Sequence, residues 1–344
     1  MLHRVVTVDQ ANAMGISKRQ AYRYAEKGKW LKLQNGIFLT DPELVDDELW
    51  KANLASLLLH GGAGALVSHR SAAILHGLEG ITGRELEVTV PTNARRLPLG
   101  AHRTNWVDPH PVIIDGLATT SIERTLCDLA TVCDADVVEQ ALESALRGPD
   151  HWCPDQWNEG LLGDLRRAVL LHPRRPGTFR MRTVLYRRSD TDRPTGSFTE
   201  TVLMQAMRKV GIPFVRQATV RIVDRKASRL DTLFPDFAIV GPLMLVEADG
   251  LEAHSTQDAL ARDLLRQNKL ALVFTIRRYT ALQILNDPSG VANEIKQVML
   301  RIEKSGPNRI NGVSVTYSEN EFLVVDQNRD ARQEAMSRSP RRAS

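Results

Sequence analysis

The sequence predicts a multidomain protein of the α+β or α/β class. The chain has 344 residues, which is more than one hydrophobic core usually serves, so we expect two or three domains. Helix-like segments and strand-like apolar runs follow one another at both ends of the chain. The hydrophobic content of 42% and charged content of 25% are those of an ordinary globular protein.

The composition excludes several classes of protein. No apolar run approaches the roughly 20 residues of a membrane span, and the amino terminus lacks the apolar core of a signal peptide. We therefore expect a cytoplasmic protein with no membrane partner. Cys127, Cys133 and Cys153 have no metal-ligand spacing, and their odd number argues against a disulfide framework. The net charge of +4 is compatible with a nucleic-acid partner.

Residues 1–45 have the pattern of a winged helix-turn-helix. A short helix over 8–14 precedes a second helix over 18–27, in which Ser17 is the N-cap and Gln20 its capping-box partner. Two apolar stretches around the turn Gln34-Asn35-Gly36 then predict a small hairpin. In a winged helix-turn-helix, the second helix enters the major groove of DNA.

That second helix carries side chains suited to phosphates and base edges. They are Lys18, Arg19, Gln20, Arg23 and Lys27. The sequence thus predicts DNA as a partner of this helix. The alternative is a solvated basic face on a small protein-interaction domain.

Residues 46–150 are expected to form an α/β domain. The helices are predicted over 46–60, 68–78, 121–130 and 134–147, and the strands over 86–90 and 112–114. His69 and His76 lie seven residues apart and share a helix face. Without a third ligand nearby, they are interpreted as core or surface residues rather than a metal site.

Two segments of this domain carry a resemblance to a known family. The stretches ALVSHRSAAILHGL (65–78) and ATTSIERTLCDLA (118–130), after an amino-terminal winged helix, resemble the abortive-infection type IV antitoxin family. The resemblance covers about the first 150 residues. It implies a winged helix that binds operator DNA and represses its own operon, with a nucleotidyltransferase-like toxin as cognate partner.

Two further regions complete the expected domain organisation. Residues 151–196 are predicted to be a helical connector that ends in the breaker-rich linker 189–196. Residues 304–344 are predicted to be an extension whose Ser/Arg-rich tail is disordered.

The most informative stretch is a predicted hairpin bearing three carboxylates. Two apolar runs, 234–240 and 243–246, flank a Gly-Pro turn. A turn centred between these two residues places Asp236 opposite Glu247, and Asp249 shares the face of Glu247. Opposed like charges are destabilising, and buried carboxylates are costly unless they are paired or bind a metal. The pattern therefore predicts a divalent cation.

Asp231 is an alternative to Asp236 in this hairpin. It follows Arg229-Leu230, which also resembles the start of such a motif. Asp236 is preferred because its spacing to Glu247 fits one short hairpin, whereas Asp231 needs a longer one.

The elements around the hairpin resemble the PD-(D/E)XK restriction-endonuclease-like fold. The order is a helix over 198–210, a strand over 217–223, the hairpin, a helix over 257–272, a strand over 273–276 and a helix over 290–302. It is most similar to the very-short-patch-repair-endonuclease-like branch. The resemblance covers 197–303 and implies an α/β/α domain with a central mixed sheet.

This resemblance implies a set of roles in metal-dependent phosphodiester hydrolysis, with Mg²⁺ or Mn²⁺ as cofactor. Asp236 and Glu247 are the expected metal ligands, with the Ala248 carbonyl as a third. The other expected participants are Glu200 to orient water, His254 as base or leaving-group acid, and Arg266 or Lys269 at the phosphate. Gln217 and Asp263 belong to the same pattern. Asp249 stands where the classical motif has a lysine that polarises the water, a substitution that this branch often shows.

Simpler structural interpretations stay open for several of these residues. Asp249-Gly250 is also a turn signal, and His254 is also compatible with an ordinary loop. The spacing of Asp263, Arg266 and Lys269 is also that of ion pairs on a helix surface.

The sequence therefore predicts a DNA-acting, metal-dependent endonuclease-like protein with an antitoxin-like DNA-binding module, of the kind used in phage defence. The alternative function is a non-catalytic transcriptional repressor or antitoxin in which the nuclease-like fold is only a scaffold. An RNA substrate is a third possibility.

Overall fold

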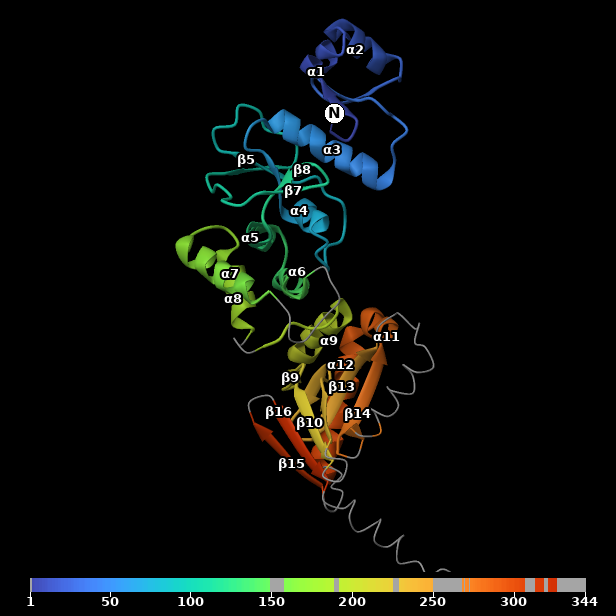
Figure 1. Cartoon of the computed structure of the whole chain (residues 1–344), viewed down its shortest axis with the longest axis vertical. Helices are drawn as coiled ribbons and strands as arrows, with labels where there is room; N and C mark the ends of the chain where they lie inside the picture. The colour runs from blue at the N-terminus through green and yellow to red at the C-terminus, as the bar shows by residue number, and fades with distance from the viewer. Residues whose placement is uncertain are drawn as a thin grey trace, which may run out of the picture. The chain divides into compact units, whose positions relative to one another are not determined.

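The computed structural model describes residues 2–148, 158–188, 192–224, 229–249, 268, 270–271, 273–306, 313–318 and 321–326. The chain divides into two compact units (Figure 1). The first comprises 1–145 with 158–188, and the second comprises 146–157 with 189–344. Both units combine helices with β-sheets, so the protein is of the predicted mixed α/β class.

The first unit begins with two short helices and a three-stranded sheet. The elements are β1 (Val5–Thr7), α1 (Val8–Ala13), α2 (Lys18–Glu26), β2 (Leu31–Gln34) and β3 (Ile37–Leu39). The strand order is β1-β3-β2, and all pairs are antiparallel. Val6, Ala21 and Phe38 form a small buried core between the sheet and the helices. The sequence predicted both helices and the β2–β3 hairpin, whereas it gave no signal for β1.

The caps of these two helices differ from the prediction. The expected capping box between Ser17 and Gln20 is incomplete: the Ser17 hydroxyl accepts the Gln20 N–H at 3.3 Å, but the Gln20 side chain donates to the Tyr24 hydroxyl at 3.1 Å. A complete capping box instead joins Thr7 and Gln10 at the start of α1. The Tyr24 hydroxyl lies one turn along α2 and competes for the Gln20 amide.

A five-stranded mixed sheet follows in the same unit. The strands of this sheet and the helices around it are, in chain order, α3 (Asp46–Gly61), β4 (Leu66–Val67), α4 (His69–Leu75), β5 (Val88–Pro91), β6 (Ala101–Thr104), β7 (Val112–Ile114), β8 (Leu117–Thr119), α5 (Ile122–Val132) and α6 (Ala135–Arg147). The strand order is β6-β5-β4-β8-β7, so β6 lies at one edge. Residues such as Leu54, Val67, Val88 and Leu117 join α3 to the sheet in one apolar core.

Two more helices complete the first unit. These are α7 (Glu159–Leu171) and α8 (Thr178–Tyr186), which contact each other and α5. Gly177 precedes α8 with φ +82°, and a Cβ at this position would lie 2.8 Å from the carbonyl carbon of Ala130. Much of the segment that the sequence predicted to be a connector thus belongs to the first unit.

The second unit contains two four-stranded sheets and three helices among its described residues. The elements are α9 (Phe198–Lys209), β9 (Val215–Arg216), β10 (Thr219–Asp224), β11 (Arg229–Leu233), β12 (Phe237–Ile239), β13 (Met244–Asp249), β14 (Thr275–Thr280), α11 (Ala281–Asn286), α12 (Pro288–Ser305), β15 (Val313–Ser318) and β16 (Glu321–Asp326). The sheet orders are β14-β13-β12-β9 and β11-β10-β16-β15.

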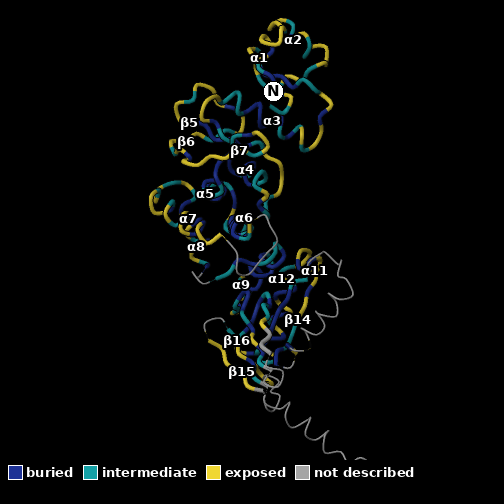
Figure 2. Tube along the Cα trace, in the orientation of Figure 1, coloured by how far each residue is buried: buried dark blue, intermediate teal, exposed yellow. Residues whose placement is uncertain are grey.

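The first of these sheets lies between helices and the other sheet. One of its faces packs against α9, α11 and α12, and it buries Leu203, Phe237 and Ile295 (Figure 2). Its other face packs Leu245 against residues of the second sheet such as Phe322. The resemblance implied a second helical layer instead, and most of the helix expected over 257–272 lies outside the described residues.

Residues 313–326 lie in the region that the sequence analysis assigned to a carboxyl-terminal extension. In the structure, 313–318 and 321–326 form the antiparallel strands β15 and β16, and β16 pairs in parallel with β10. The Ser/Arg-rich tail beyond them lies outside the described residues.

Candidate metal centre and nucleic-acid interface

The carboxylate hairpin has the register that the sequence predicted. Strands β12 and β13 are antiparallel, and Phe237 pairs with Val246. This register places Asp236, one residue before β12, opposite Glu247. The Asp236 carboxylate accepts the backbone N–H of Ala248 at 2.8 Å, and Glu247 is only 6% exposed. The two acidic residues therefore meet at the end of a buried hairpin.

Asp231, the alternative to Asp236, lies elsewhere in the unit. It belongs to β11, where it pairs with Ile222 of β10 in the other sheet. Asp236 is thus the aspartate that shares a hairpin with Glu247.

Glu200 is linked to this hairpin through Gln217. The Glu200 side chain, in the first turn of α9, accepts hydrogen bonds from the Gln217 side chain at 2.9 Å and from the Gly196 N–H at 2.6 Å. The backbone N–H of Gln217 donates to the Asp236 carbonyl at 2.8 Å. Burial raises the pKa of the Glu200 carboxyl, although these hydrogen bonds and Arg147 favour its charged form. Glu200 and Gln217 therefore position the start of β12.

Gln217 has a left-handed backbone conformation, with φ +47°. Such a conformation is uncommon for a residue other than glycine and asparagine, and it costs free energy that the surrounding contacts must offset. Here the side chain and the backbone N–H of the same residue hold Glu200 and Asp236.

Asp249 is engaged by an arginine that the sequence analysis did not single out. Arg278 of β14 donates to both Asp249 carboxylate oxygens at 2.6–3.1 Å, and its Nε lies 3.7 Å from a Glu247 carboxylate oxygen. Arg278 pairs with Glu247 across the parallel β13–β14 ladder. The charge of Asp249 is thereby largely compensated, so a metal at this edge would be held mainly by Asp236 and Glu247.

The donor set fits magnesium, which takes oxygen ligands and commonly only one or two carboxylates, with water and phosphate completing its shell. Within the described parts of the chain, no three His, Cys, Asp or Glu side chains are grouped to hold a metal. The Ala248 carbonyl stays a predicted ligand, while its N–H is bound by Asp236.

The remaining residues expected at the site belong to the segment between β13 and β14. His254, Asp263, Arg266 and Lys269 lie outside the described residues.

The helix predicted to enter DNA presents its basic side chains to solvent. Lys18, Arg19 and Arg23 of α2 are exposed, and so is Lys27, the C-cap residue that follows the helix. Gln20 is half-buried, and its side chain is bound to Tyr24 rather than presented with the others. A shallow hollow on this helix is lined by Lys18, Arg19, Tyr22, Arg23 and Glu26.

The basic character of this region extends to the β2 strand. Lys32 places its ammonium 5.4 Å from the centroid of the Tyr22 ring, and Lys29 lies 5.9 Å from that of Tyr24. Cations and aromatic rings on one surface are a common feature of nucleic-acid interfaces.

Comparison with models of known protein families gives no match, and neither does comparison with curated protein sequences. None of the described helices combines the length and the apolar character needed to cross a lipid bilayer.

Proposed function

We propose that this chain is a DNA-acting protein with a restriction-endonuclease-like, metal-dependent phosphodiesterase domain and an amino-terminal winged helix-turn-helix that binds DNA. The observation that carries the proposal is the opposition of Asp236 and Glu247 at the end of a buried hairpin. Glu247 is buried and Asp236 is half-buried, and burying carboxylates is costly unless cations compensate them.

In this proposal Asp236 and Glu247 hold Mg²⁺ or Mn²⁺, which when bound supplies an activated water and neutralises charge on the phosphate. Asp236 is oriented by the Ala248 N–H and by its link through Gln217 to Glu200. Arg278 keeps Asp249 beside the site. The exposed basic side chains of α2 support DNA as the substrate.

A second candidate function is a DNA-binding repressor or antitoxin without catalytic activity. The Arg278–Asp249 pair favours it, because Arg278 brings a positive charge to the acidic edge without any metal. In that case a cognate toxin and operator DNA are the proposed partners.

The test of the catalytic proposal is cleavage of plasmid DNA by the full chain with Mg²⁺ or Mn²⁺. Asp236→Asn and Glu247→Gln keep the side-chain shapes and remove the charges. Each substitution should lower the cleavage rate by at least about 100-fold, since losses of 10–100-fold follow even from removing partners of metal ligands. Asp231→Asn is the matched control and should cleave at the wild-type rate.

Cleavage that survives both site substitutions would contradict the assigned metal centre. Two results together would favour the repressor. The wild-type protein would cleave neither DNA nor RNA of the same sequence, and the Asp236→Asn variant would still bind operator DNA. Faster cleavage of the RNA would identify it as the substrate.

A further inference from the structure

The first unit contains a hollow that neither DNA binding by α2 nor the carboxylate hairpin uses. It has a volume of about 1080 Å³ and is formed by residues of β5, β6 and α5 with the segment between α7 and α8. Its basic lining includes His69, His102, Arg103, Arg124, Arg174 and Arg175, and none of its lining residues is an aspartate or glutamate. The hollow is therefore suited to an anion.

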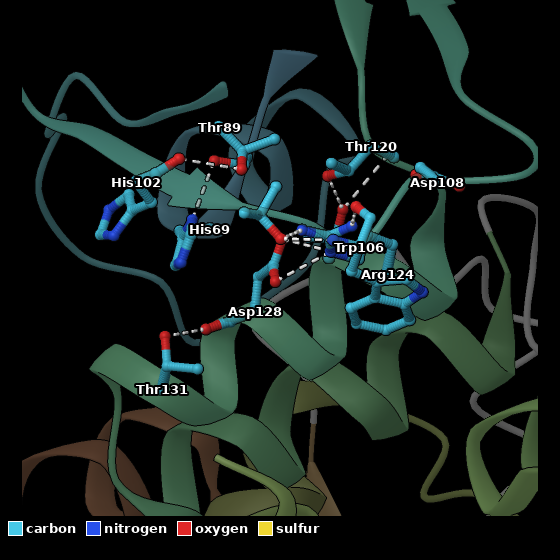
Figure 3. A network of polar contacts seen from close by, with 12 residues as sticks. His69, Thr89, His102, Trp106, Asp108, Thr120, Arg124, Asp128 and Thr131 are labelled. Atoms are coloured by element: carbon cyan, nitrogen blue, oxygen red, sulfur yellow. Dashed lines mark hydrogen bonds and ion pairs between the residues drawn. The ribbon is translucent and has the colours of Figure 1, made fainter. Parts of the chain in front are cut away.

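The base of the hollow is a buried network around Asp128 (Figure 3). The Arg124 Nε lies 2.9 and 3.0 Å from the two Asp128 oxygens, and an Arg175 nitrogen lies 2.8 Å from one of them. Asp128 is fully buried. One carboxylate thus serves two guanidinium groups, which leaves a net positive charge.

Trp106 holds both arginines in place. The guanidinium carbons of Arg124 and Arg175 lie 4.2 and 3.7 Å from the centroid of its ring, and the Trp106 carbonyl accepts from Arg124 at 2.7 Å. These contacts fix the guanidinium planes before any ligand binds, which lowers the entropic cost of binding.

Arg175 retains unused hydrogen-bonding capacity. Its second terminal nitrogen, Nη1, is buried and has no hydrogen-bond partner within the described part of the chain. A buried donor without an acceptor costs free energy, and the cost is larger for a charged group. Burial lowers the pKa of Arg175 only to about 10, so the guanidinium stays charged at neutral pH. This nitrogen is enclosed, whereas 19% of the Arg175 side chain is exposed, so an anion in the hollow would meet the exposed part of this charged group.

Two stacked histidines form another part of the lining. The rings of His69 and His102 lie 3.7 Å apart at 21°, side by side in Figure 3. The His69 Nδ1 is 2.8 Å from the Ser68 hydroxyl oxygen. His76, the residue that follows α4, instead contacts the Thr120 carbonyl at 2.7 Å. The two histidines at the ends of α4 therefore have separate roles, and only His69 lines the hollow.

We propose that this hollow binds a phosphate monoester, with a nucleotide as the class of ligand, through Arg175, Arg103 and Arg174. Planar guanidinium groups match the geometry of phosphate oxygens, and arginine is the preferred residue where phosphate is recognised. The volume exceeds that needed for inorganic phosphate and is typical of small-molecule sites. A phosphate of the nucleic-acid backbone offers the same chemistry, and the experiment separates the two sources.

The experiment is isothermal titration calorimetry of the full chain at low salt, with AMP, with inorganic phosphate and with a 12-nucleotide DNA strand. Arg103→Gln combined with Arg174→Gln removes two exposed cations of the lining. This double variant should bind AMP at least about 10-fold more weakly, the loss expected from one charge-assisted hydrogen bond. Arg167→Gln combined with Arg182→Gln is the control, because both residues are exposed in the same unit and outside the hollow.

The DNA strand is titrated in a Lys18/Arg19/Arg23 triple-alanine background, so that binding at α2 does not conceal the hollow. If the wild type does not bind AMP, and the Arg103/Arg174 substitutions abolish binding of the DNA strand, the site would be assigned to backbone phosphate. Equal affinities in the lining and control variants, or binding of none of the three probes, would overturn the proposal. Asp236→Asn should leave AMP binding unchanged, which distinguishes this site from the proposed metal centre.

Discussion

At the scale of single residues, His69 makes the folded first unit sensitive to acid. It is 4% exposed and lies in a positive environment that includes His102 and Arg124. Burial, reinforced by these neighbours, lowers its pKa from 6.5 to about 2. Above pH 6.5 both the folded and unfolded states carry a neutral imidazole. Below it only the unfolded state gains the proton, so the free energy of unfolding declines by about 1.4 kcal/mol per pH unit from this residue.

His69→Asn should remove this dependence. Asparagine tolerates the left-handed backbone at this position, where φ is +53°. Urea unfolding followed by tryptophan fluorescence at pH 7.5 and 5.5 should show a decline that is about 1.4 kcal/mol smaller in the variant than in the wild type. His110→Asn, at an exposed position, should keep the wild-type decline. Equal declines in all three proteins would rule out His69 as the source.

At the scale of elements, different residues of the β12–β13 hairpin contribute to the stability of the fold and to the proposed metal site. Leu245 is fully buried and packs against the second sheet, while Asp236 and Glu247 lie at the end of the hairpin. Leu245→Ala should lower the free energy of unfolding by about 2–5 kcal/mol, because it leaves a cavity in the core. Leu282→Ala, in the same unit at 62% exposure, should change it by no more than about 0.5 kcal/mol.

Circular dichroism during urea unfolding measures both variants. A loss in Leu245→Ala no larger than that in Leu282→Ala would contradict the packing described for the second unit.

Local signals predicted the elements that depend on neighbouring residues. Gly241-Pro242 fixed the turn, and with it the register that opposes Asp236 and Glu247. The Ser17 cap and Gly28, which has φ +69°, delimit α2. In each case the residues that decide the structure are close in sequence.

The sequence analysis missed contacts between residues that are far apart in the sequence, because local patterns carry no signal for such contacts. Arg278 reaches Asp249 only because β14 lies parallel to β13, and the predicted strand ended at Ile276, before this arginine. Strands of two or three residues, such as β1 and β4, are too short for a periodic pattern. The hollow combines β6 with the segment before α8, a proximity that no spacing in the sequence encodes.

At the scale of the whole molecule, DNA binding should depend on charge carried by α2. The Lys18/Arg19/Arg23 triple-alanine variant loses three exposed cations. Each phosphate contact contributes about 0.9 to the slope of log affinity against log salt concentration, so the slope should fall by up to about 3. Fluorescence anisotropy with labelled DNA measures this change, and Asp236→Asn is expected to keep the wild-type slope. An unchanged slope in the triple variant would place the DNA contact elsewhere.

The position of β16 sets the order in which the second unit can be completed. This strand lies between β10 and β15, and its partner β10 is about 100 residues earlier in the chain. During synthesis from the amino terminus, one edge of β10 therefore has no partner strand until residues 321–326 have been synthesised. The first unit has no such delay, because its sheets are complete once β8 has emerged. We expect nascent chains to fold their amino-terminal unit first, and to depend on chaperones most while β10 is exposed.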